Sequence, residues 1–222
     1  MLMKKVFFGV AIILFAMNSC APSRYVIPLA EKQKAITANF GGPTIGFSGA
    51  IIPIPLTAVG YGYGIDSNTT VFGNFHTTSL LFGVFQTDIG VCRNLYRGKN
   101  GFGVSGNLVA NLTFDKWEHN FRGWPQIDLN AYKKYNSRGS FFYAGCDNWI
   151  ELSKYRAHHQ PQNVHLIFNA HAGITFVHSK WNYQLEAKYL APYVNNLPNV
   201  VDYKGISHHG AFGIYFGVYR LF

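Results

Sequence analysis

Charged residues are scarce in this chain of 222 residues, at 13% of the sequence. A soluble domain usually carries about 25%. Acidic residues are the fewest, with 10 Asp and Glu against 19 Lys and Arg, whereas aromatic residues reach 17%. So few charges do not cover a water-exposed surface, and the composition therefore argues against an ordinary soluble domain.

Long hydrophobic runs are missing as well. The apolar run at residues 6–16 follows Lys4 and Lys5. It is shorter than the roughly 20 residues that a membrane-spanning helix needs, and it has the length of a signal-peptide core. We therefore expect an exported chain whose residues 1–19 are a cleaved lipoprotein signal peptide, as the next motif indicates.

Cysteine is rare, with three residues in all. The first closes the motif MNSC (residues 17–20), which resembles the lipobox of bacterial lipoproteins, in which the cysteine is acylated. Met17 and Asn18 depart from the usual residues, so ordinary signal-peptide cleavage stays open as the alternative. Acylation of Cys20 would anchor the chain in outer-membrane lipid. By the same resemblance, Ala21 favours outer-membrane delivery by the lipoprotein-sorting machinery. Residues 20–33 carry two prolines and no periodicity, and we expect a lipidated tether there.

Helical periodicity is absent after the signal peptide, and a period of two replaces it. Segments 104–114, 164–176 and 181–189 alternate apolar residues with mostly uncharged polar ones. A soluble barrel would carry many Lys and Glu on its polar face, whereas the lumen of a membrane barrel needs only uncharged polar groups. Because backbone groups in lipid must all be paired, the sheet must also close. The sequence predicts an all-β fold, a closed antiparallel up-and-down transmembrane β-barrel, at residues 34–222.

The predicted strands number about ten, and eight to twelve remain compatible with the pattern. Their connections alternate in length, as in outer-membrane barrels, which have short periplasmic turns and longer outer loops. This alternation predicts a periplasmic C-terminus. In VGYGYGI (59–65), glycines alternate with bulky residues, which indicates little room on one side of the strand. The predicted strands are 34–40, 55–65, 69–75, 80–94, 102–114, 124–134, 139–149, 164–177, 181–190 and 209–222.

The last strand, AFGIYFGVYRLF, ends on an aromatic residue with apolar residues at alternating positions before it. It resembles the C-terminal signature of outer-membrane β-barrels. With the lipobox, the chain resembles small outer-membrane barrel lipoproteins of Gram-negative bacteria. The resemblance implies insertion by the barrel-assembly machinery and no particular activity. Four tryptophans near strand ends are predicted to lie in interfacial aromatic girdles: Trp117, Trp124, Trp149 and Trp181.

The net charge of +9 would suit a nucleic-acid partner, but the basic residues form no single patch and an exported chain does not meet nucleic acid. Many of them lie in short turns, where they would meet anionic head groups. We predict no nucleic-acid partner.

Strand parity assigns a set of polar residues to the lumen. In a narrow barrel the charged ones are predicted to pair across it, because an isolated buried charge is costly. This predicted lumen network consists of Asp88, Asp128, His165, Asn169, His171, Gln184, Glu186 and Lys188.

Few residues suggest other chemistry. Histidine pairs in two outer loops, His158 with His159 and His208 with His209, are weak candidates for a metal site because imidazole suits zinc, copper and nickel. No other signal points to a metal, and none to a cofactor. Cys92 and Cys146 belong to predicted strands that are not neighbours, so a disulfide is not expected.

Three functions remain open from the sequence. The first is a non-enzymatic outer-membrane barrel lipoprotein serving envelope structure, surface interaction or small-solute passage. The second is a barrel enzyme that modifies lipid or lipopolysaccharide, which would place a Ser or Asp beside His171 or the rim histidines. The third is a soluble lipid-tethered barrel with a hydrophobic ligand, which needs Phe168, Ile174 and Leu185 to point inward.

Overall fold

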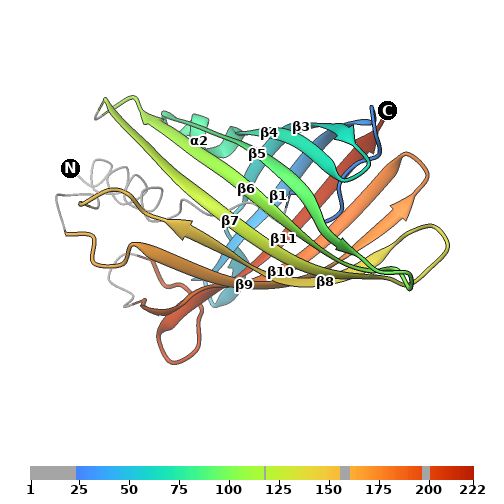
Figure 1. Cartoon of the computed structure of the whole chain (residues 1–222). Coiled ribbons are helices and arrows are strands. Elements are labelled where there is room, and N and C mark those ends of the chain that lie inside the picture. Colours follow the sequence, from blue (N-terminus) through green and yellow to red (C-terminus); the bar gives the residue numbers. More distant parts are fainter. Residues whose placement is uncertain (1–23, 118, 156–160, 197–200) are drawn as a thin grey trace.

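The structure is a computed structural model that describes residues 24–117, 119–155, 161–196 and 201–222. Most of them belong to strands of one sheet (Figure 1). The strands are β1 (Lys34–Phe47), β2 (Ala50–Pro53), β3 (Leu56–Asp66), β4 (Thr69–His76), β5 (Val84–Arg97), β6 (Phe102–Asp115), β7 (Asn120–Lys134), β8 (Phe141–Ile150), β9 (Leu166–His178), β10 (Trp181–Asn195) and β11 (His209–Leu221).

The sheet closes on itself. From β3 to β11 each strand pairs antiparallel with the next, and β1 pairs with both β3 and β11. At the seam, Ala35 of β1 lies opposite Leu221 and Pro43 lies opposite Gly213. Because β2 pairs only with the distal end of β1, ten strands form the wall. The predicted closed antiparallel barrel of ten strands is confirmed.

The outer face of the wall is apolar and the inner face is polar, as predicted. Phe168 and Leu185 are exposed on the outside, and Ile174 is half-buried on the same face. Polar side chains such as Gln184 and Asn169 are buried on the inside. Alternation along a strand sends successive side chains to opposite faces, so an apolar exterior and a polar lumen follow from one pattern. The alternative of a soluble barrel with an apolar interior is therefore wrong.

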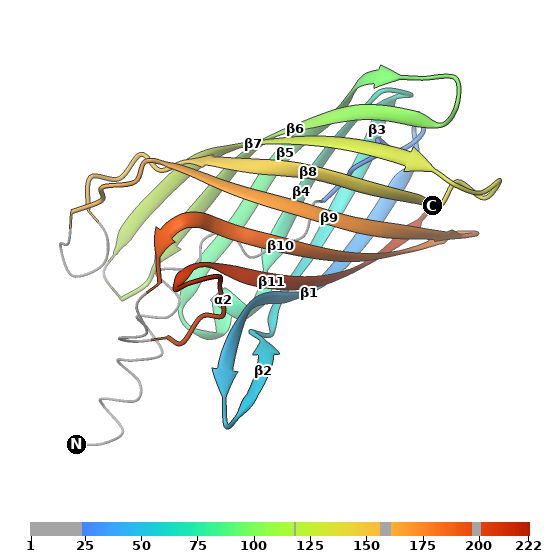
Figure 2. The ribbon, with the colours of Figure 1, turned by 90° about the horizontal axis from the view of Figure 1, so that it is seen from below.

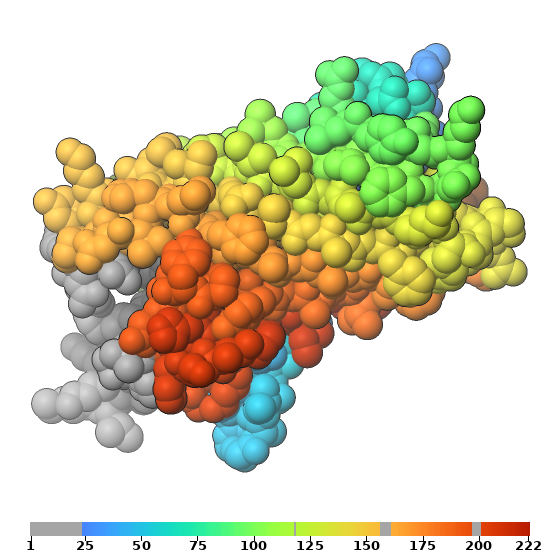
Figure 3. All heavy atoms as spheres, turned by 60° about the horizontal axis from the view of Figure 1, so that its bottom comes forward, coloured from blue at the N-terminus to red at the C-terminus, as the bar shows by residue number. Residues whose placement is uncertain are grey.

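A hairpin occupies a region predicted to be a loop. Strand β1 continues past the wall to Phe47 and turns back into β2, with Ile45 opposite Ile52. Ile45 also bridges to Tyr203. The hairpin stands out from the barrel (Figure 2). Figure 3 shows it in cyan beside the red-orange part of the chain around β10 and β11. Residues 43–58 carry no charge and include four isoleucines, so they extend a strand where loop residues were expected.

A helix of one turn, α2 (Thr77–Leu81), follows β4, where only a short connection was predicted. Gly83 ends it with φ +79, in the left-handed region that glycine adopts freely. Strand β5 therefore begins at Val84 rather than near residue 80. Within the described ranges, no helix has the length and apolarity to cross a membrane.

Candidate functional site: a plugged polar lumen

The barrel lumen contains the chain's own N-terminal segment. Residues 24–29, here called the plug, are mostly buried, with Arg24, Tyr25 and Val26 at most 5% exposed. Residues 30–33 connect the plug to the start of β1. A lipidated tether was predicted at residues 20–33; residues 24–29 of it lie buried in the lumen, and residues 20–23 lie outside the described part of the chain.

Four strands hold the plug by hydrogen bonds to its backbone. Thr70 Oγ1 of β4 accepts from the Leu29 amide at 2.7 Å. Cys92 Sγ of β5 donates to the Tyr25 carbonyl at 3.0 Å, and Ser105 Oγ of β6 donates to the Val26 carbonyl at 2.5 Å. The Tyr219 hydroxyl of β11 donates to the Arg24 carbonyl. These contacts satisfy plug backbone groups that the lumen would otherwise bury unpaired.

Glycines of β3 make room for the plug. A side chain at Gly62 would collide with the Tyr25 ring, and one at Gly64 would collide with the Ala30 carbonyl. The Tyr25 ring also packs on Phe72 and edge-on to Tyr219, each with ring centroids 5.5 Å apart. The alternating glycines therefore serve close approach of another segment, as their pattern indicated.

An ion pair anchors the plug at its N-terminal end, Arg24. Arg24 Nε and Nη2 donate to the two carboxylate oxygens of Asp88 at 3.0 and 2.7 Å. Asp88, with 0% exposure, also accepts from Asn74 Nδ2 at 2.7 Å and contacts His76 Nε2 at 2.9 Å. A two-pronged guanidinium contact fixes orientation as well as charge, so Arg24 is held in one position.

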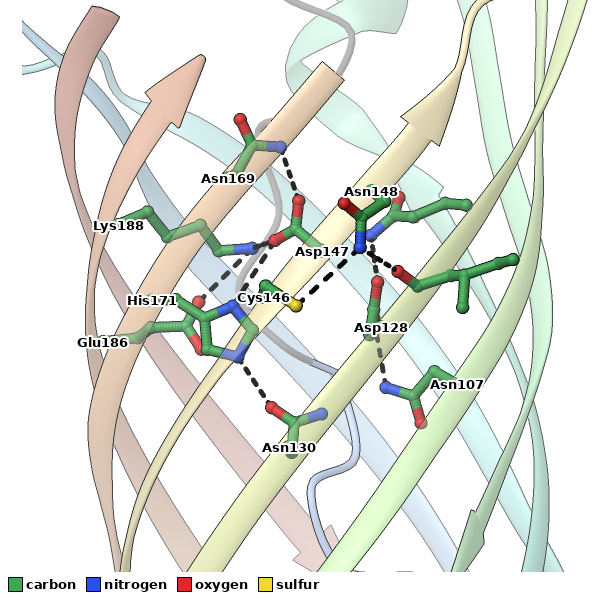
Figure 4. A network of polar contacts seen from close by, with 12 residues as sticks. Asn107, Asp128, Asn130, Cys146, Asp147, Asn148, Asn169, His171, Glu186 and Lys188 are labelled. Carbon is green, nitrogen blue, oxygen red and sulfur yellow. Dashed lines mark hydrogen bonds and ion pairs between the residues drawn. The ribbon is translucent and has the colours of Figure 1, made fainter. Parts of the chain in front are cut away.

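A second polar network lines the opposite part of the wall (Figure 4). Lys188 Nζ lies 2.7 Å from Asp147 Oδ2 and 3.5 Å from Glu186 Oε1. Asn169 donates to Asp147 at 2.5 Å, and His171 Nε2 lies 2.7 Å from Asn130 Oδ1. Strands β7 to β10 contribute these side chains from their inner faces.

Asp128 lies next to this network, in register with Asp147 on the neighbouring strand. Its carboxylate accepts from Gln126 Nε2 at 2.8 Å and from Asn107 Nδ2 at 3.1 Å. Among the described residues, no cationic side chain lies within 4.0 Å of it. Asp128 is therefore a buried carboxylate held by neutral amides alone.

The predicted lumen residues fall into two groups. Seven of them are buried on the inner face: Asp88, Asp128, Asn169, His171, Gln184, Glu186 and Lys188. His165 is exposed instead, because β9 begins at Leu166, so the alternation that assigned it inward has not yet started. Its Nδ1 lies 2.8 Å from the Glu151 carbonyl.

Several lumen residues were not predicted. Arg24 was placed in the tether, and Asp147, in the predicted strand 139–149, was not assigned to the lumen. Two tryptophans were assigned to the interface but lie inside: Trp124 and Trp149 are buried on the inner face, with ring centroids 6.0 Å apart. Trp117 and Trp181 are exposed. The inward pair has the same parity as Gln126 and Asp147, which is the signal that could have found it.

The described residues form neither a metal site nor a disulfide. His208 and His209 are exposed, and His209 Nδ1 lies 2.8 Å from the Ser207 carbonyl. His158 and His159 lie outside the described residues. No group of three or more His, Cys, Asp or Glu able to hold a metal occurs in the part of the chain that the structure describes. Cys92 and Cys146 are both free thiols.

The enzyme alternative depended on a nucleophile or acid beside a histidine. Asp147 Oδ2 lies 3.6 Å from His171 Nδ1, beyond ordinary hydrogen-bond length. Both side chains are buried in the lumen network. An acid is thus near His171, but it faces the lumen, away from the outer wall where lipid would lie.

Comparison with known proteins gives likenesses of shape only. No protein-family model matches the chain, and no curated protein matches it. Among solved structures, it is similar to an outer membrane channel from Pseudomonas putida F1 (TM-score 0.49, 10% identity, 90% of this chain and 99% of that one). It is also similar to the translocator domain of the autotransporter NalP from Neisseria meningitidis (TM-score 0.47, 10% identity, 86% and 89%). The barrel assignment rests on the strand pairing itself.

Proposed function

We propose that the chain is a non-enzymatic outer-membrane barrel that limits the passage of small solutes. Its closed wall leaves no unpaired sheet edge, and large apolar side chains such as Phe216 and Leu185 are exposed around it. Hydrocarbon accepts such a surface, whereas water does not. With the short turns and C-terminus on the periplasmic side, the long connections face outward.

The single observation that carries the passage role is a polar lumen filled by a separable segment. The wall alone would enclose a polar bore, and residues 24–29 occupy it through a few hydrogen bonds and one ion pair. The plug supports the view that passage is closed at rest and opens when the plug shifts.

We also propose that Cys20 carries the lipid, four residues before Arg24. In this proposal the barrel-assembly and lipoprotein-sorting machineries are the partners, and nucleic acid is not. Labelled palmitate should enter the wild-type chain and not Cys20→Ser. Equal labelling of both would overturn lipidation and leave the barrel proposal standing.

Gel migration and salt extraction test the membrane barrel, and bilayer conductance tests the passage role. The folded chain should migrate faster on a gel before heating than after it, as closed membrane barrels do, and it should resist salt extraction from membranes. In planar bilayers the wild-type chain should conduct rarely, and Arg24→Gln should open more often because the plug loses its anchor. Silence of both proteins across many insertions would overturn passage and favour a structural or surface-interaction role.

A further inference from the structure

Among the described residues, buried carboxylates outnumber buried cations, although the whole chain has more basic than acidic residues. The chain carries a net +9, and its exposed basic residues gather in the short turns. Of the described residues, the buried ones with fixed charge are two cations and five carboxylates. They are Arg24, Lys188, Asp88, Asp115, Asp128, Asp147 and Glu186.

The ion pairs do not include Asp128, which has no cationic side chain within 4.0 Å among the described residues. Arg24 is paired with Asp88, and Lys188 is shared between Asp147 and Glu186. Asp128 has only the neutral donors described above. His76 and His171 also lie against carboxylates, with ring nitrogens 2.9 Å from Asp88 Oδ2 and 3.6 Å from Asp147 Oδ2. The middle of the lumen therefore has more carboxylates than cations.

Movement of the plug increases the imbalance. Arg24 is one of the two buried cations, and it belongs to the plug, whereas the carboxylates belong to the wall. If the plug shifts, Asp88 loses its ion-pair partner and only Lys188 remains among four mid-lumen carboxylates. A low-dielectric channel lined by one sign of charge concentrates ions of the opposite sign.

We propose that the open lumen selects small cations over anions, with Asp128 as a selectivity-determining residue. This inference rests on the proposed passage role and names its solute class. It runs against the expectation from the net charge of the chain, which would favour anions. The lumen carboxylates decide the preference because a permeating ion passes close to them, while the basic turns lie at the rim and are screened by salt.

The test is the reversal potential of Arg24→Gln in a potassium chloride gradient, at about pH 8, where an ordinary histidine is neutral. We expect potassium to be preferred over chloride several-fold. Adding Asp128→Asn should lower that ratio, whereas adding Asp66→Asn, the same exchange at the exposed end of β3, should leave it unchanged.

The heat-dependent gel shift confirms that each variant is folded, and Glu186→Gln replaces Asp128→Asn if that variant fails to fold. Currents that prefer chloride, or a ratio that neither variant lowers, would overturn cation selectivity while leaving passage intact. Absence of current in every variant would overturn passage and this inference together.

Discussion

At the scale of single residues, the plug depends on missing side chains as much as on present ones. Tyr25 can lie against β3 because Gly62 presents no side chain to it. Arg24 can be buried because Asp88 offers two carboxylate oxygens. Burial of a charge without such a partner would be costly. Substitutions at Gly62 and at Arg24 therefore test separately the space that the plug occupies and the ion pair that holds it.

Gly62→Ala tests whether Tyr25 of the plug needs the space beside Gly62. The added methyl group would meet the Tyr25 ring, so we expect the plug to move and bilayer conductance events to become more frequent. Gly73→Ala is the matched control, because its methyl group would meet the nearest atom at 3.4 Å, an ordinary contact. Identical conductance of the two variants would contradict the close packing of Tyr25 on β3.

Arg24→Ala tests how much the ion pair with Asp88 stabilises the barrel. Removing one partner of a buried ion pair costs about 3 kcal/mol, because the other charge stays buried. We expect a lower urea midpoint for loss of the heat-dependent gel shift, and partial recovery when Asp88→Asn is added. Arg138→Ala, in an exposed turn, should leave the midpoint unchanged. Additive effects of the two lumen substitutions would argue against the pair.

At the scale of elements, the sequence predicted strands better than what lies between or inside them. A period of two is a local property, so β6, β9 and β10 were predicted within a few residues at most of their ends, apart from the extension of β10 to Asn195. The plug was missed because its partners are remote: Arg24 and Asp88 are 64 residues apart. Residues 24–33 have no periodicity, and their sequence does not reveal such partners.

The position of the plug can be followed through a thiol. Cys92 is fully buried and bonded to the Tyr25 carbonyl, whereas Cys146 alternates with the inward Asp147 and so lies on the outer face. In a Cys146→Ala background, a charged thiol reagent should label Cys92 slowly, and adding Arg24→Gln should accelerate labelling. The reaction is followed by mass spectrometry. Fast labelling of Cys92 with Arg24 intact would contradict a seated plug.

At the scale of the whole molecule, charge is divided by location. Basic side chains surround the end that carries the short turns, carboxylates dominate the lumen, and the outer wall is apolar. This division was only partly predictable. The charge of the wall and turns follows from alternation and turn position, and the predicted lumen network already held more carboxylates than cations. Arg24 and Asp147, which add one charge of each sign to the lumen, could not be assigned to it from the sequence.

The basic end should hold anionic lipid. Each cation near an anionic membrane surface contributes about 1 kcal/mol. We expect native mass spectrometry of the barrel to show bound phosphatidylglycerol, and fewer bound molecules in Lys133→Gln/Lys134→Gln. The same exchange at the opposite rim, Lys116→Gln/Lys154→Gln, should have no effect. Equal loss in both double variants would show that the short-turn end has no special affinity.

The plug lies inside the seam between β1 and β11. Residues 24–29 contact β4, β5 and β6, which follow them closely in the chain, and also Tyr219 of β11, 195 residues beyond Arg24. The β1–β11 pairing encloses them. We expect a segment enclosed in this way to support the unfinished curved sheet before its first and last strands pair. Chains without it would have to curl around an empty, hydrated space.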